Sequence, residues 1–295
     1  MKRNYNKHIG KNLLVLMLVL NFSGCTRASK PEAKLPNVVF ILADDIGQGD
    51  IGYYHTERTG NKPVIPTPHL DDLVMNGIRF DDAHTVSALC SPTRYSVMTG
   101  NYTFRSYRPW GVWSACAKSA VGKDQLTVGD IMQDAGYKTA FFGKWHLGGD
   151  WHVKGTNEIY RGIGTGDETT DFTQIVGGAP NHLGFDYSFM LPSGIQNNPF
   201  AYYENTQWMP LGEDSEIIIN PELHGGFHNR KHPRFADSNW NTSEAGPRLV
   251  KKAIAFIDRQ VKENPEQPFF VYYCSQAVHV RSEERRVGKE CATGC

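Results

Sequence analysis

The feature that most constrains the fold is an unbroken apolar run near the start of the chain. Residues 38–43, VVFILA, are all apolar, and two aspartates, Asp44 and Asp45, follow them directly. A short run of this kind is typical of a strand that is buried on both faces of a largely parallel sheet. The run therefore predicts a central strand whose carboxyl end carries two acidic side chains.

Helix and strand patterns alternate along the chain. Segments 67–77 and 127–136 each begin with a threonine that suits an N-cap and end at a glycine that suits a helix stop. Residues 138–142 and 268–273 predict further strands, and a long amphipathic helix precedes the second of them. The residues expected on its inward face are Val250, Ala253, Ile254, Ile257 and Val261. This alternation indicates an α/β sandwich with a central, mostly parallel sheet flanked by helices.

Between residues 150 and 241 the pattern weakens into glycine-rich loops that carry aromatic side chains. We expect these loops to be insertions that cover the carboxyl edge of the sheet, where specificity is usually built. The aromatic residues have two interpretations, stacking on sugar rings or packing within the loops. They are Tyr202, Tyr203, Trp208 and Trp240.

The N-terminal segment predicts an exported protein. A basic start is followed by eight apolar residues, 13–20, which are too few to span a bilayer and suit a signal peptide over residues 1–24. NFSGC resembles a bacterial lipoprotein cleavage box, which implies a lipid anchor at Cys25 and a periplasmic or outer-membrane location in a Gram-negative bacterium. Ordinary signal cleavage nearby is the alternative. Residues 25–35 are expected to form a linker.

The charge balance argues against a nucleic-acid partner. Lys plus Arg and Asp plus Glu both total 31, so the formal net charge is zero, whereas nucleic-acid proteins normally carry a basic surplus. The six cysteines show no CxxC pair and no zinc spacing. The sequence does not decide whether Cys116 forms a disulfide with another cysteine.

Polar side chains follow the three predicted strands. Asp44 and Asp45 follow the first, Lys144 and His146 in GKWH follow the second, and His279 follows the third. Carboxyl ends of parallel strands line the crevice where ligands bind in open α/β sheets. Adjacent carboxylates there are hard oxygen ligands for Ca²⁺ or Mg²⁺. A turn or a helix cap is the alternative for the two aspartates.

The segment CSPTRYSVMTG, residues 90–100, predicts a helix over residues 91–99 with Pro92 in its first turn. Cys90 then lies at the positive end of the helix dipole. There it is either a low-pKa thiolate nucleophile or a buried structural cysteine, and spacing alone leaves both open.

Three segments resemble the type I sulfatases. CSPTRYSVMTG resembles the signature whose cysteine is converted to formylglycine, GYKTAFFGKWHLG resembles the second signature, and NVVFILADDIGQGDIG resembles the opening strand with its metal-binding aspartates. The resemblance covers residues 36–280. It implies an alkaline-phosphatase-like fold and a hydrolase that removes sulfate from a sulfated carbohydrate or an aryl sulfate.

The resemblance also implies a role for each site residue. Cys90, converted to formylglycine by a maturation enzyme, would supply a hydrated aldehyde as the nucleophile. Asp44 and Asp45, with the modified Cys90, would hold Ca²⁺ or Mg²⁺. Arg94 would support the hydrate, and Lys144 would neutralise the charge of the sulfate. His146 would transfer the diol proton, and His279 would bind the sulfate or the leaving group.

The chain departs from the family after His279. The family adds a second acidic pair on a later strand and a smaller C-terminal domain, whereas Glu283 and Glu284 lie in a tail, residues 281–295, that resembles a translated sequencing adapter. A solvated charged helix end is the alternative for this tail. We expect a fragment that lacks the C-terminal subdomain, with an incomplete calcium site and little or no activity. The rival functions are a phosphodiesterase or phosphonate hydrolase of the same superfamily, and a non-catalytic exported glycan binder.

Overall fold

The computed structural model describes residues 34–219 and 234–279. The chain divides into two units, residues 1–36 and 37–295, and every element below belongs to the second. The expected signal peptide, the lipid anchor at Cys25 and the tail at 281–295 lie outside the described residues. No helix within the described ranges combines the length and the apolar character that a membrane crossing needs.

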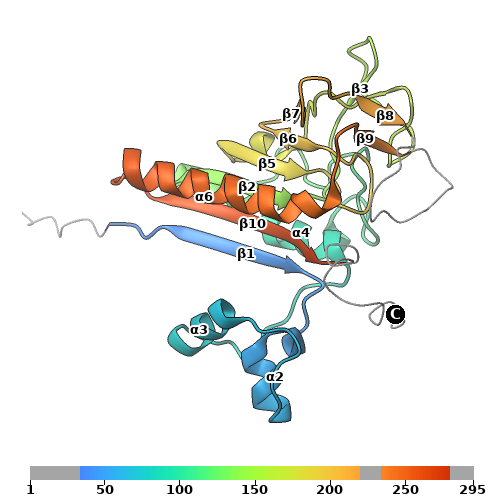
Figure 1. Ribbon diagram of the computed structural model, residues 1–295. Helices are drawn as coiled ribbons and strands as arrows, with labels where there is room; N and C mark the ends of the chain where they lie inside the picture. Colours follow the sequence, from blue (N-terminus) through green and yellow to red (C-terminus); the bar gives the residue numbers. More distant parts are fainter. Residues whose placement is uncertain (1–33, 220–233, 280–295) are drawn as a thin grey trace, which may run out of the picture. The chain divides into compact units, whose positions relative to one another are not determined.

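A six-stranded sheet forms the centre of the fold (Figure 1). The first four strands in its spatial order are parallel, the fifth is antiparallel to the fourth, and the sixth is antiparallel to the fifth. In that order the strands are β1 (Val38–Asp44), β10 (Phe269–Val278), β2 (Lys138–Lys144), β5 (Tyr187–Leu191), β6 (Tyr202–Glu204) and β7 (Gln207–Met209). The prediction of an α/β fold with a central, mostly parallel sheet is confirmed.

Helices cover both faces of this sheet because successive side chains of a strand point to opposite faces. Phe141 packs into one hydrophobic core with side chains of α4 (Cys90–Thr99) and α5 (Val128–Asp134). Phe142, the next residue of β2, packs into a second core with side chains of α6 (Ala245–Glu263). Each core therefore seats one helical layer against the sheet.

The remaining elements are short. The other helices and 3₁₀ turns are α2 (Gly52–Thr59), α3 (Pro68–Asn76), η1 (Gln48–Asp50), η2 (Thr103–Arg105), η3 (Pro180–His182) and η4 (Thr242–Glu244). Two small antiparallel sheets pair β3 (His152–Val153) with β4 (Thr170–Asp171) and β8 (Ile217–Ile219) with β9 (Phe235–Asp237).

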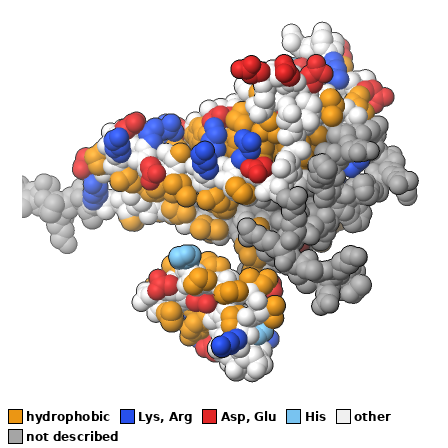
Figure 2. Space-filling model, in the orientation of Figure 1, with side chains coloured by type: hydrophobic (Ala, Val, Ile, Leu, Met, Phe, Trp, Pro, Cys, Tyr) orange, Lys and Arg blue, Asp and Glu red, His pale blue; other side chains and the backbone are white. Residues whose placement is uncertain are grey.

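The prediction that the first strand is central and buried on both faces is wrong for the described residues. There, β1 lies at the sheet edge and pairs with β10 alone. Val39, Phe40 and Ile41 are exposed, and Ile41 retains 61% of its accessible surface. Hydrophobic side chains accordingly reach the surface along β1 (Figure 2). An apolar run specifies a strand, but the neighbours of that strand decide its burial.

The inward face predicted for the long helix is partly wrong. Val250, Ile254 and Val261 are exposed in α6. The buried apolar residues of this helix are Ala245, Leu249, Ala253 and Phe256. The helix carries two neighbouring apolar stripes, and contact with the sheet selects one of them.

The region between residues 150 and 241 is more than a set of covering loops, because it supplies β5, β6 and β7 of the main sheet. Tyr202, Tyr203 and Trp240 are buried, and Tyr202 stacks on Phe189. Sugar stacking is therefore wrong for these three residues, and packing within the fold is their role. Trp208 is half-buried and donates through Nε1 to Asp237.

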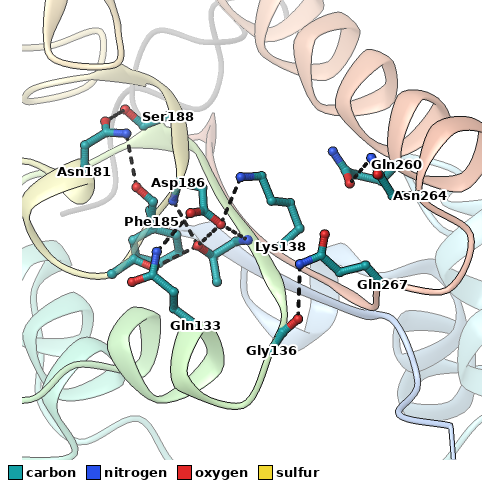
Figure 3. Close-up of polar contacts among 12 residues, drawn as sticks. Gln133, Gly136, Lys138, Asn181, Phe185, Asp186, Ser188, Gln260, Asn264 and Gln267 are labelled. Carbon is teal, nitrogen blue, oxygen red and sulfur yellow. Dashed lines mark hydrogen bonds and ion pairs between the residues drawn. The ribbon is translucent and has the colours of Figure 1, made fainter.

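At the amino edge of the sheet, Asp186 joins three segments (Figure 3). Its carboxylate accepts hydrogen bonds from the Thr139 amide and from Gln133 Nε2, and Lys138 Nζ lies 3.4 Å from Oδ2. Burial raises the pKa of Asp186, but the hydrogen bonds from Thr139 and Gln133 and the charge of Lys138 outweigh burial and hold this pKa below its ordinary value. The ionised carboxylate therefore stabilises the junction of α5, β2 and β5.

We predict that Asp186→Asn lowers the free energy of unfolding by about 1–2 kcal/mol at pH 7, because the donors of Gln133, Lys138 and Thr139 lose their charged acceptor. The native pKa is depressed, so the contribution is complete above the unfolded pKa of about 3.9 and is lost as pH falls through the native pKa. Urea unfolding of both proteins at neutral and at acidic pH measures this contribution. The difference in unfolding free energy between the wild type and Asp186→Asn should be smaller at acidic pH. Asp134→Asn, an exposed acid of α5, is the control. Equal stabilities of wild type and Asp186→Asn at pH 7 would contradict the prediction.

Candidate active site

Three adjacent parallel strands deliver polar side chains to one edge of the sheet. Asp44 is the last residue of β1, Lys144 is the last residue of β2, and His279 directly follows β10. Because β10 lies between β1 and β2 and all three are parallel, their carboxyl ends meet. The structure thus brings together side chains that the sequence placed at three strand ends.

Gly143 allows the close approach of β2 to β10 just before Lys144. Its φ of +101° lies in the region that favours glycine. A Cβ at this position would lie 1.9 Å from the carbonyl oxygen of Cys274. The backbone of β10 therefore leaves no room for a side chain at position 143, which explains the glycine in GKWH.

Lys144, Asp44 and Arg94 form a buried charged cluster. Lys144 Nζ donates to Asp44 Oδ2 over 2.7 Å, and Arg94 NH2 lies 3.6 Å from the same oxygen. Arg94 NH1 also donates to the Lys144 carbonyl over 2.7 Å. The three side chains are 1%, 5% and 3% exposed. Two buried cations share this carboxylate, so the cluster carries surplus positive charge that suits an anion.

Helix α4 places Cys90 beside this cluster. Cys90 is the first residue of the helix, and Arg94 lies one turn later on the same face. Cys90 Sγ lies 3.2 Å from Nδ1 of His146. Ser91 Oγ donates to the carbonyl of His146 over 2.7 Å, which ties the start of the helix to the segment after β2. Cys90 and His146 are therefore paired at the carboxyl edge.

His146 is held as a neutral imidazole. Burial, followed by the positive charges of Lys144 and Arg94, lowers the pKa of His146 well below its ordinary value. Its φ of +57° lies in the left-handed region, as does the φ of +58° at Asp45. Strained non-glycine residues of this kind cost about 1–3 kcal/mol each and cluster at functional sites. A neutral imidazole beside Cys90 can accept or donate a proton there.

Asp44, Asp45 and His279 form a group that could hold a metal ion, since one ligand atom from each lies within 4.8 Å of the others. Carboxylate oxygens fit Ca²⁺ or Mg²⁺, whereas an imidazole nitrogen suits transition metals better. His279 Nε2 lies 3.4 Å from Asp45 Oδ2. Cys90, predicted as a third ligand after its modification, lies with its unmodified Sγ 3.2 Å from His146 Nδ1, and its part in metal binding stays a prediction. The two aspartates fit a hard divalent cation, and the role of each residue stays a prediction.

The loop after β5 is the part of the site that sequence reasoning missed. Gln196 Oε1 lies 3.4 Å from Lys144 Nζ, and Gly194 packs against the aliphatic stem of the same lysine. The signal was present in YSFML, because a parallel strand there would have delivered the following PSGIQ segment to the same edge. Cys90, Cys116 and Cys274, the cysteines within the described ranges, are free thiols.

Comparisons with known proteins agree on one family. The family model described as Sulfatase matches residues 36–293. The chain is 26% identical over 314 residues to an N-acetylgalactosamine-6-O-sulfatase of Bacteroides thetaiotaomicron, which covers 93% of the chain and 55% of that protein. It is 36% identical over 255 residues to the arylsulfatase A of Bos taurus, covering 85% of the chain and 43% of that protein.

Solved structures share the fold. One structure, described as part of glycosaminoglycan metabolism in Bacteroides thetaiotaomicron, matches with a TM-score of 0.66 at 26% identity. The match covers 87% of this chain and 54% of that one. The chain thus spans about half the length of the curated relatives that it matches.

We predict that Asp44→Asn lowers the free energy of unfolding by about 3 kcal/mol, because it leaves two buried cations without their carboxylate. Asp45→Asn is the matched control. Its side chain is 56% exposed, so the same change should cost less than about 1 kcal/mol. Urea unfolding in EDTA, which removes any effect of bound divalent cations, measures both. Equal losses for the two variants would contradict the stabilising role of Asp44 as the carboxylate that pairs with both buried cations.

Proposed function

The chain belongs to the sulfatase family, and we propose that the whole protein is a sulfuric ester hydrolase acting on a sulfated carbohydrate. The observation that carries the proposal is the pair of buried cations, Lys144 and Arg94, beside Cys90 at the start of α4. A sulfate group carries negative charge on oxygens that such cations bind. The 3.2 Å contact between Cys90 Sγ and His146 Nδ1 supports a reaction of the ester's sulfur atom at residue 90 in this proposal.

Each residue has a physical task in this proposal. Lys144 and Arg94 neutralise the sulfate oxygens in a site of low dielectric, where charge interactions are strong. His146, neutral through burial and nearby positive charge, takes up or returns a proton at the side chain of residue 90. Conversion of Cys90 to formylglycine by a maturation enzyme would supply a hydrated aldehyde as an oxygen nucleophile. Ser91 holds the His146 backbone in place.

We assign Asp44 and Asp45 to a divalent cation, Ca²⁺ or Mg²⁺, with His279 beside them. When bound, the cation would supply further positive charge to the sulfate oxygens. His279 Nε2 lies close enough to Asp45 to orient that carboxylate, and the family resemblance gives His279 a part in binding the sulfate or the leaving group.

The substrate class rests on the relatives. One of them is named an N-acetylgalactosamine-6-O-sulfatase, so a sulfated hexosamine or galactose unit is the substrate we propose. The N-terminal sequence supports export, with a lipid anchor at Cys25 and a maturation enzyme that meets the chain beforehand.

We predict that Cys90 is converted when the chain is co-expressed with a formylglycine-generating enzyme. Mass spectrometry of the peptide that carries residue 90 should show the thiol replaced by an aldehyde or its hydrate. Cys90→Ala is the control and should show neither. A thiol that stays intact in the co-expressed chain would contradict the proposal and favour a non-catalytic glycan binder.

Activity of the whole protein separates the rival enzymes. Assays on an aryl sulfate and a sulfated hexosamine should show sulfate release that is abolished in Cys90→Ala, and a parallel assay should show slower hydrolysis of a phosphate diester. Faster turnover of the diester would favour the phosphodiesterase alternative.

A further inference from the structure

The loop that follows β5 packs directly onto Lys144. Gly194 has a φ of +76°, and a Cβ there would lie 2.9 Å from Cδ and 3.2 Å from Cγ of Lys144. Because Gly194 has no side chain, the loop backbone can lie against the lysine stem. Gln196, two residues further on, consequently reaches the lysine ammonium group.

The contact with Lys144 decides which way the Gln196 amide faces. Lys144 Nζ is a donor only, so the atom 3.4 Å away must be the amide oxygen, Oε1. The NH₂ group, Nε2, then points away from the ammonium. This atom is buried, and residues 34–219 and 234–279 offer it no hydrogen-bond acceptor. A buried donor without an acceptor costs about 1–3 kcal/mol, which a ligand oxygen would offset.

Two other polar atoms in the segments that carry Gln196 and Lys144 also lack a hydrogen-bond partner among the described residues. Ser193 Oγ lies on the same loop in a fully buried residue, and His146 Nε2 lies two residues after Lys144. Neither atom has a hydrogen-bond partner in the part of the chain that the structure describes. Three such atoms in the two segments that carry Lys144 and Gln196 suit a ligand with several oxygens. The Gln196 donor has no lone pair to offer a metal ion, so that ligand is an anion rather than a cation.

We infer that Gln196 is a sulfate-positioning residue, whose Nε2 donates to one sulfate oxygen while Oε1 keeps Lys144 in place. The inference rests on the proposed sulfatase function and deepens it, because it adds a neutral hydrogen-bond donor to the cationic contacts proposed for the sulfate. A carboxamide does not ionise near neutral pH, so Gln196 binds and orients the sulfate and does not act as a general acid or base.

We predict that Gln196→Ala binds inorganic sulfate about tenfold more weakly than the wild-type chain, the loss expected for one hydrogen bond to a charged group. Isothermal titration with sodium sulfate measures this. Gln196→Glu should bind sulfate more weakly still, because it keeps an oxygen toward Lys144 but turns the donor into a negatively charged acceptor. Gln267→Ala is the matched control, since this glutamine lies at the opposite edge of the sheet and donates to the Gly136 carbonyl. It should bind sulfate like the wild type.

The alanine variant carries the test, because Gln196→Glu brings a negative charge near the sulfate whatever the role of the amide. Sulfate binding by Gln196→Ala that equals wild-type binding would overturn the inference. A wild-type chain that binds no sulfate would overturn it too. Thermal unfolding of each variant reports whether the fold survives, and Gln196→Glu should unfold no earlier than the wild type. The conversion of Cys90 does not involve Gln196. The mass-spectrometric test of the sulfatase proposal is therefore independent of the sulfate-binding test of Gln196.

Discussion

The ion pair between Lys144 Nζ and Asp44 Oδ2 joins two residues that are 100 positions apart in the chain. Both side chains are buried, and burying a charge is costly unless an opposite charge meets it in good geometry. The pair spans β10, so it requires β1, β10 and β2 to be parallel and in register. Gly143 permits the close approach of β2 to β10 on which this register depends.

The rest of the site is arranged around this pair. Arg94 contacts both members, through the carboxylate of Asp44 and the carbonyl of Lys144, and so fixes the position of α4. Fixing α4 in turn places Cys90 against His146. The positive charges that suit an anion also lower the pKa of His146, so one cluster supplies both the binding charge and the neutral imidazole. The positive charge that suits an anion and the neutral state of His146 therefore share a physical origin.

Much of the site could be predicted because strand ends in a parallel sheet converge. The apolar runs before Asp44 and Lys144 indicate strands, and the direction of parallel strands then brings the following polar residues to one edge. The same rule missed Gln196, because the short strand β5 lies in a glycine-rich region and was expected to be a loop. The orientation of α6 was only partly predicted, because the periodicity of apolar residues does not show which side of the helix packs against the sheet.

The sequence by itself determined the α/β class, the helix that begins near Cys90, and the residue types at the carboxyl edge, because these depend on local periodicity and on short motifs. Only the tertiary structure decided that β1 lies at the sheet edge within the described residues, and that Tyr202, Tyr203 and Trp240 are packing residues. It also decided that the loop after β5 reaches Lys144. Burial and contact depend on which segments become neighbours, and neighbours far apart in the chain leave no local pattern in the sequence.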